Sequence, residues 1–119
     1  MTSNLAVKAL FKAIDAKDAD AFVDFLTEDA VFRFGSQDAV NGRPAIREYV
    51  AQFFGMIQAL SHRINVTWEK EDGVLCEGEV TYTKLDGSKV TLPFADAFHM
   101  KGDKVKDYLV YIDPAPLFS

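Results

Sequence analysis

Asp96 is a charged residue in the otherwise largely apolar run Pro93–Met100. If this run is a strand, alternate side chains share a face, and Asp96 lies beside Phe94, Phe98 and Met100. Aromatic neighbours solvate a carboxylate poorly, which favours the neutral acid and raises its pKa. We therefore expect Asp96 to be a catalytic acid or a hydrogen-bond donor. The alternatives are that it faces the other way, or that it accepts hydrogen bonds from a tyrosine hydroxyl or a loop amide.

Aromatic residues on the predicted inward faces are candidates for the wall of a ligand pocket. Three of them are tyrosines, and a buried phenol needs a hydrogen-bond partner from a ligand or from another side chain. Packing in a core would also explain each of them. The predicted ligand-binding residues are Phe34, Tyr49, Phe53, Tyr82, Phe94, Phe98, Tyr108 and Val110.

The remaining chemistry-bearing residues predict no second site. His62 and His99 have no carboxylate at metal-ligand spacing, so no metal or other cofactor is expected. We interpret His62 as a structural residue bonded to a backbone carbonyl, and His99 as an exposed or interface residue. Cys76 has no adjacent base, and the chain lacks a glycine-rich phosphate loop, so nucleophilic catalysis is disfavoured.

Composition narrows the class of protein. The chain has 119 residues, of which 49% are hydrophobic, and this suits one domain over residues 1–119. A net charge of -5 with scattered basic residues argues against a nucleic-acid partner. The single cysteine favours a reducing compartment, and Lys8 interrupts the first apolar run too early for a signal peptide or a membrane span. We expect a cytoplasmic protein with no membrane partner.

The first half of the sequence has mainly helical periodicity. Apolar residues predict an amphipathic helix over 6–15, and Asp18 is placed to cap a short second helix. A short alternation predicts a strand over 30–34. The third helix should begin near residue 43 and continue to about residue 60, with Phe53 on its buried stripe.

The second half has the period of two that is typical of strands. Strands are predicted over 62–70, 74–84, 89–100 and 104–113, with Asp-Gly or Gly-Asp turns between them. In the first of these strands, Ile64, Val66 and Trp68 are expected on one face. The predicted fold is α+β, with three N-terminal helices packed in a curved antiparallel sheet that forms a cone around a central pocket.

Five segments, taken in order and spacing, resemble SnoaL-like proteins of the nuclear transport factor 2-like superfamily. They are Ala13–Asp18, Leu26–Val31, Asn41–Tyr49, Gly102–Val105 and Tyr111–Leu117. The resemblance covers nearly the whole chain. It implies three helices in a curved antiparallel sheet around a deep conical pocket, and often a dimer through the outer face of the sheet.

The superfamily includes polyketide cyclases, ketosteroid isomerases and epoxide hydrolases. Asp96 matches the late-strand acid of the isomerase pattern, but Leu10 stands at its tyrosine position and Phe34 at its base position. Val110 stands at the last-strand acid of the epoxide hydrolase pattern, and the Arg-x-Asp pair of that pattern is missing near Gly78. The resemblance therefore implies the pocket and its acid without implying either reaction.

Two functions are compatible with these residues. One is a pocket protein for a small hydrophobic, carbonyl-bearing molecule, with Asp96 as the acid of an isomerase, cyclase or dehydratase. The alternative is a non-catalytic ligand-binding or dimerisation domain. A homodimer is expected in both cases.

Overall fold

The computed structural model describes residues 6–118. Helices α1 (Val7–Asp15), α2 (Ala19–Val23) and α3 (Arg43–Gly55) accompany a six-stranded sheet, and a short helix, α4 (Ala115–Phe118), follows the last strand. The strands are β1 (Leu26–Phe34), β2 (Val40–Asn41), β3 (Ile57–Lys70), β4 (Gly73–Lys84), β5 (Lys89–Lys101) and β6 (Lys104–Ile112). The predicted α+β fold with three N-terminal helices is confirmed, and α4 is an additional element.

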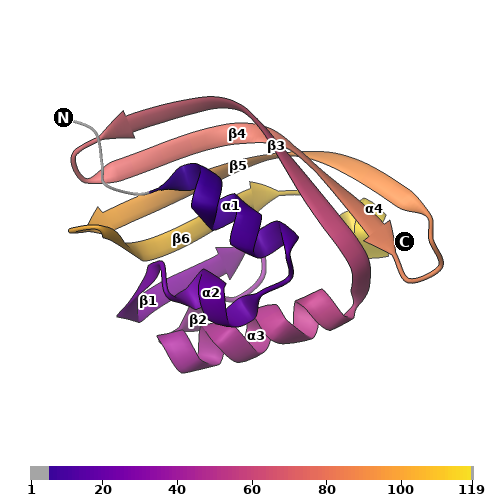
Figure 1. Ribbon diagram of the computed structural model, residues 1–119, viewed down its shortest axis with the longest axis horizontal. Coiled ribbons are helices and arrows are strands. Elements are labelled where there is room, and N and C mark those ends of the chain that lie inside the picture. The colour runs from indigo at the N-terminus through magenta and orange to yellow at the C-terminus, as the bar shows by residue number, and fades with distance from the viewer. Residues whose placement is uncertain (1–5, 119) are drawn as a thin grey trace.

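The sheet has the order β2-β1-β6-β5-β4-β3. Consecutive hairpins make the long strands β3 to β6 antiparallel, as the Asp-Gly and Gly-Asp turns predict. The pairing of β1 with β6 is parallel, which the long connection between these two strands allows. Figure 1 shows α1, α2 and α3 on the same side of this curved sheet, which remains open. The buried side chains lie between these helices and the concave face of the sheet.

The third helix is shorter than predicted. It ends at Gly55, and β3 already begins at Ile57, so Ile57 and Leu60 belong to a strand. A register shift between Ile57 and Ala59 inserts an extra residue into the β3–β4 pairing. That bulge lets two residues three apart, Ile57 and Leu60, both be buried. The same spacing occurs on one face of a helix, which is why the sequence pattern extended the helix too far.

A second bulge redirects the far half of β3. Ile64 pairs with the inward-facing Gly78, but after a register shift Trp68 pairs with Leu75 on the convex face. Trp68 is 52% exposed and Leu75 44%. The prediction that Ile64 and Trp68 share a face is therefore wrong, because the extra residue reverses the alternation.

Glycine at position 78 permits this second bulge. A Cβ atom added to Gly78 would lie 1.9 Å from the carbonyl oxygen of Arg63 in β3. No side chain fits at that distance, so the two backbones approach closely only because residue 78 has none. Figure 1 shows the result, a long curved β3 that starts beside the end of α3 and reaches the opposite end of the sheet.

No helix among residues 6–118 is long and apolar enough to span a membrane.

Candidate functional site

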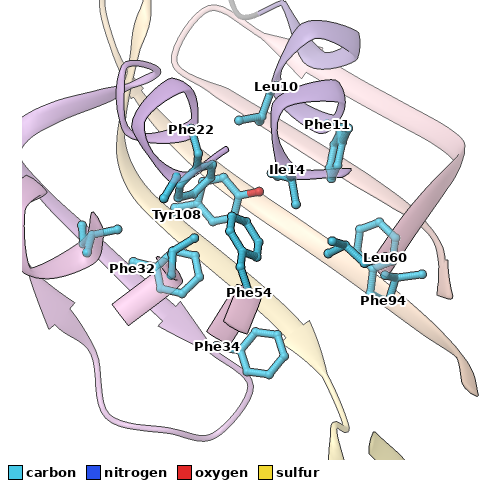
Figure 2. Close-up of a cluster of buried hydrophobic side chains, with 14 of the residues drawn as sticks. Leu10, Phe11, Ile14, Phe22, Phe32, Phe34, Phe54, Leu60, Phe94 and Tyr108 are labelled. Carbon is cyan, nitrogen blue, oxygen red and sulfur yellow. The ribbon is translucent and has the colours of Figure 1, made fainter. Parts of the chain in front are cut away.

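A cavity of about 60 Å³ lies between the concave face of the sheet and the helices. Its wall is mostly aromatic, and Figure 2 shows Phe22, Phe32 and Phe54 gathered around Tyr108. The lining residues are Ile14, Phe22, Phe32, Phe34, Tyr49, Val50, Phe53, Phe54, Leu60, His62, Val80, Tyr82, Phe94, Asp96, Tyr108, Val110 and Ile112.

Asp96 lies in this apolar wall, on β5, between Cys76 of β4 and Val110 of β6. It is 2% exposed, and within the described part of the chain it is the only charged or polar residue that is buried to this degree. Its Oδ1 atom is buried and has no hydrogen-bond partner among residues 6–118. Burial raises the pKa of this carboxyl group well above its ordinary value. The geometry therefore favours a neutral acid, and no tyrosine hydroxyl or loop amide bonds to Oδ1.

Two tyrosines contribute further hydroxyl groups to the wall. Burial raises the pKa of Tyr82 and of Tyr108, and the nearby Asp96 raises both further. Both phenols therefore keep their protons, and neither hydroxyl bonds to another residue within the described range. The Tyr108 hydroxyl is the red atom in Figure 2. Tyr49 differs, because its hydroxyl donates a hydrogen bond to the side-chain oxygen of Gln37.

His62 also lines the cavity, and the structure overturns our interpretation of it. Its Nδ1 atom lies 2.6 Å from Oδ1 of Asp15, and its backbone N–H donates to Oδ2 of the same carboxylate at 3.0 Å. The partner is thus a carboxylate rather than a backbone carbonyl. Asp15 ends α1 and His62 lies early in β3, so the pair forms only through the tertiary fold.

Lys17 holds the turn after α1 in place, close to the Asp15–His62 pair. Lys17 has a positive φ of 56°, which is uncommon for a residue with a side chain. Its Nζ atom donates to the backbone oxygens of Phe54, Ile57 and Gln58, at 3.1, 3.0 and 3.2 Å. These carbonyls belong to the end of α3 and the start of β3, so Lys17 ties the end of α1 to the strand that carries His62.

Most of the residues predicted from the sequence come together. Asp96 and seven of the eight predicted ligand-binding residues line the cavity; the seven are Phe34, Tyr49, Phe53, Tyr82, Phe94, Tyr108 and Val110. Phe98 does not. It is fully buried and packs against Tyr108 with ring centroids 4.5 Å apart, outside the cavity lining. Its position on the Asp96 face is as predicted, but it belongs to the core further along β5.

Sequence reasoning missed several wall residues. Phe54 and Leu60 were missed because the phase of α3 and the start of β3 were misplaced. Phe22 of α2 and Phe32 of β1 also line the cavity and were not among the predicted ligand-binding residues. The pairing of Asp15 with His62 left no sequence signal, since the residues are 47 positions apart.

His99 and Cys76 lie outside the cavity lining. His99 is on the outer side of the sheet with a side chain 61% exposed, as expected, and its Nδ1 atom is 3.1 Å from Asp107. Cys76 is buried, and burial raises the pKa of its thiol to about 12, so it is a poor nucleophile. Within residues 6–118, no three histidine, cysteine or acidic side chains gather as a metal site would require.

Comparison with known proteins decides the family. The model of the SnoaL-like domain matches residues 7–108, which is most of the chain. The chain belongs to the SnoaL-like domain family. No protein of curated function matches its sequence.

Solved structures share the fold of this SnoaL-like protein at low sequence identity. A protein from Catenulispora acidiphila with a ketosteroid isomerase-like fold, in complex with trimethylamine, is 18% identical, with a TM-score of 0.83 over 92% of this chain and 86% of that one. A protein from Jannaschia sp. described as a SnoaL-like polyketide cyclase is 19% identical, with a TM-score of 0.81 over 94% and 85%. TerC, co-crystallised with polyporic acid, is 18% identical, with a TM-score of 0.81 over 95% and 92%. At these identities the likeness establishes the fold.

Proposed function

We propose that this SnoaL-like protein binds a small, largely apolar, carbonyl-bearing molecule in its cavity and performs acid/base chemistry on it. Asp96 is the acid in this proposal. Its neutral carboxyl group donates a hydrogen bond to the carbonyl oxygen and stabilises the negative charge that develops there during reaction. Isomerisation, cyclisation and dehydration of carbonyl compounds all use such a group.

The observation that carries this proposal is the unpartnered Oδ1 atom of Asp96 in an aromatic cavity. A buried polar atom without a partner costs about 1 to 3 kcal/mol. Tyr82 and Tyr108 line the same cavity, and their hydroxyls are further donors that no other residue occupies among residues 6–118. A ligand with a carbonyl oxygen on an apolar body would satisfy them, whereas an anionic ligand would be poorly solvated there.

The size of the cavity limits the ligand. At about 60 Å³ it is smaller than a cavity of about 150 Å³ that is known to accept benzene. A ketone of three or four carbon atoms is the appropriate size, and a cyclic ketone such as cyclopentanone, which has as many non-hydrogen atoms as benzene, needs side chains at the mouth to move. A polycyclic compound would require the side chains at the mouth to move, and Phe53 is the candidate for this because it is only partly buried.

Binding of two matched probes tests the proposal. Cyclopentanone and cyclopentane differ only in the carbonyl group, and each can be titrated into isotopically labelled protein by NMR. We expect cyclopentanone to shift resonances around Asp96 and Tyr108. Asp96→Leu, which removes the donor, should weaken the binding of cyclopentanone about 10-fold and leave the affinity for cyclopentane unchanged. Equal affinity of Asp96→Leu and wild type for cyclopentanone would refute the role of Asp96.

The second candidate function is non-catalytic binding of a small amine. The Catenulispora protein of similar fold holds trimethylamine, and aromatic faces with a carboxylate can stabilise an ammonium ion. The two candidates shift the pKa of Asp96 in opposite directions. A bound ammonium ion lowers it, because the carboxylate becomes the favoured form, whereas a bound ketone raises it further. A carboxyl titration with each probe separates them.

The cellular location, the class of partner and the oligomeric state of the protein are also proposals. The net charge of -5 favours a small-molecule partner over nucleic acid, and we propose a cytoplasmic homodimer without a membrane partner.

A further inference from the structure

We propose that His62 is the proton acceptor of this cavity and that Asp15 is its positioning residue. This inference rests on the proposed function, because it assigns the base that complements Asp96. Neither residue was a candidate for chemistry from the sequence, and Phe34 stands where the isomerase pattern has its base.

The carboxylate of Asp15 determines which nitrogen of His62 can accept a proton. With Oδ1 of Asp15 only 2.6 Å from Nδ1, the neutral imidazole carries its proton on Nδ1 and donates it to the carboxylate. Nε2 then has a free lone pair. No residue in the described part of the chain bonds to Nε2, so this nitrogen is available to a ligand.

The ring of His62 is held in a fixed orientation. Phe11 and Phe94 pack against it with centroid distances of 4.9 and 5.3 Å. Asp15 also accepts the backbone N–H of His62, so one carboxylate fixes both the ring and the strand. Lys17 holds the turn that follows Asp15. This support is typical of a residue whose orientation matters for proton transfer.

His62 stands between the cavity and solvent. It lines the internal cavity and also an open groove between α1 and β3, where Asp15 borders the same groove. The side chain of His62 is 10% exposed and that of Asp15 is 30% exposed. The other charged groups that face the groove are Lys8, Lys12 and Glu69. A proton taken from a ligand can therefore leave through Nδ1 and Asp15 to water without crossing the apolar wall.

The proposed step is the enolisation of a bound ketone. The C–H bond next to the carbonyl breaks and its proton moves to Nε2 of His62. The electron pair of that bond forms the C=C bond of the enol, while the carbonyl π pair moves onto oxygen, which takes the proton of Asp96. The products are an enol, an imidazolium and a carboxylate, and the reverse step restores the ketone.

Deuterium exchange tests this step without knowledge of the natural substrate. Cyclopentanone is incubated with the protein in D₂O, and loss of its α-protons is followed by NMR. Wild type should accelerate the exchange. His62→Gln should reduce the rate about 100-fold or more, in line with the usual contribution of a general base. It should still bind cyclopentanone with an affinity within about three-fold of wild type, because the hydrogen bond to Asp96 remains.

Asp15→Asn tests the positioning role through the position of the proton on the His62 ring, which a loss of packing alone would not change. The amide can donate to Nδ1, which transfers the imidazole proton to Nε2 and removes the acceptor. We expect the ¹⁵N resonance of Nε2 to change from the lone-pair form to the protonated form, with the exchange rate falling at least about 10-fold. His99→Gln and Asp107→Asn remove the other His–Asp pair, on the outer side of the sheet, and should leave exchange unchanged.

The outcomes separate the two proposals. Exchange that persists in a folded His62→Gln variant overturns the role of His62 and leaves the binding function of Asp96 standing. Wild type that binds cyclopentanone without accelerating exchange also overturns this inference alone. If wild type binds no ketone, the proposed function fails, and the assignment of His62 fails with it.

Discussion

Asp96 has the properties expected of a neutral acid because it is buried away from water and its Oδ1 atom has no hydrogen-bond partner among residues 6–118. Its strand neighbours are Cys76 and Val110, and desolvation by burial is the cause of its raised pKa. The sequence revealed this residue because strand alternation places a carboxyl group among aromatic side chains. The Asp15–His62 pair could not be predicted in the same way, since its contact depends on how α1 lies against β3.

The raised pKa of Asp96 makes a prediction about stability and pH. A carboxyl group with a higher pKa in the folded protein than in the unfolded chain stabilises the fold less as pH rises. The loss begins near the unfolded pKa of about 3.9 and continues up to the folded pKa, with a slope of up to about 1.4 kcal/mol per pH unit. Asp96→Asn has no carboxyl group to titrate at this position. Its free energy of unfolding should therefore increase relative to that of wild type from pH 5 to pH 8.

Urea denaturation of both proteins at the two pH values measures this difference. Every titratable residue other than Asp96 remains in both proteins, so their contributions cancel in the comparison. A variant that is less stable than wild type, by an amount that increases toward pH 8, would show that the ionised form of Asp96 stabilises the fold.

At the scale of elements, α3 and β3 show where sequence periodicity succeeds and fails. The four long strands were predicted from alternation and turn chemistry, and their pairing is confirmed. The end of α3 was not predicted correctly, because a bulge at the start of β3 buries residues at helical spacing. A bulge depends on the partner strand, so one strand's sequence does not specify it.

The phase of α3 gives a second prediction. Its buried residues are Ile46, Val50 and Phe54, whereas Phe53, which was predicted on the buried stripe, is only partly buried beside the cavity. Phe54→Ala should therefore reduce the free energy of unfolding by about 3 to 5 kcal/mol. Phe53→Ala should cost clearly less and should enlarge the cavity mouth. Chemical denaturation of the two variants compares them directly, and equal losses would contradict this phase.

Gly78 gives the third prediction. Because a Cβ atom would collide with the backbone of Arg63, Gly78→Ala must push β3 away from β4. We expect a loss of about 1 to 3 kcal/mol or more, as for other overpacked sites. Gly55→Ala is the matched control, since a Cβ atom there meets nothing within 4 Å. Thermal melts of both variants provide the test, and a Gly78→Ala variant as stable as wild type would be inconsistent with the close approach.

At the scale of the whole molecule, the convex face of the sheet supports the expected dimer. The bulge in β3 places Trp68 next to Leu75 on that face, and Tyr111 is exposed on β6. Trp68 reaches this face only through the bulge, so the face is more apolar than strand alternation alone indicates. Large exposed apolar side chains are typical of protein interfaces.

We therefore predict a homodimer in solution, and Leu75→Glu should convert it to a monomer by burying a charge in the interface. Glu71→Lys, on the exposed turn between β3 and β4, is a charge-changing control. Light scattering at micromolar concentration measures both. A monomeric mass for wild type would contradict the prediction.

The cone as a whole was predictable because its hairpins, helices and family resemblance agree. Its cavity was predictable only in outline, since the small volume follows from how Phe53, Phe54 and Leu60 pack. Sequence patterns give the face of a residue but not the space left between faces.

The central claim is that Asp96 is a neutral acid inside the cavity, and a titration of its own carboxyl carbon tests this most directly. The ¹³C resonance of Asp96 can be assigned by comparison with Asp96→Asn and followed from pH 3 upward. We predict a midpoint well above the ordinary aspartate value of about 3.9, and a further rise when cyclopentanone is bound. A midpoint at or below about 3.9 would contradict the account, because the group would then be a solvated or stabilised carboxylate.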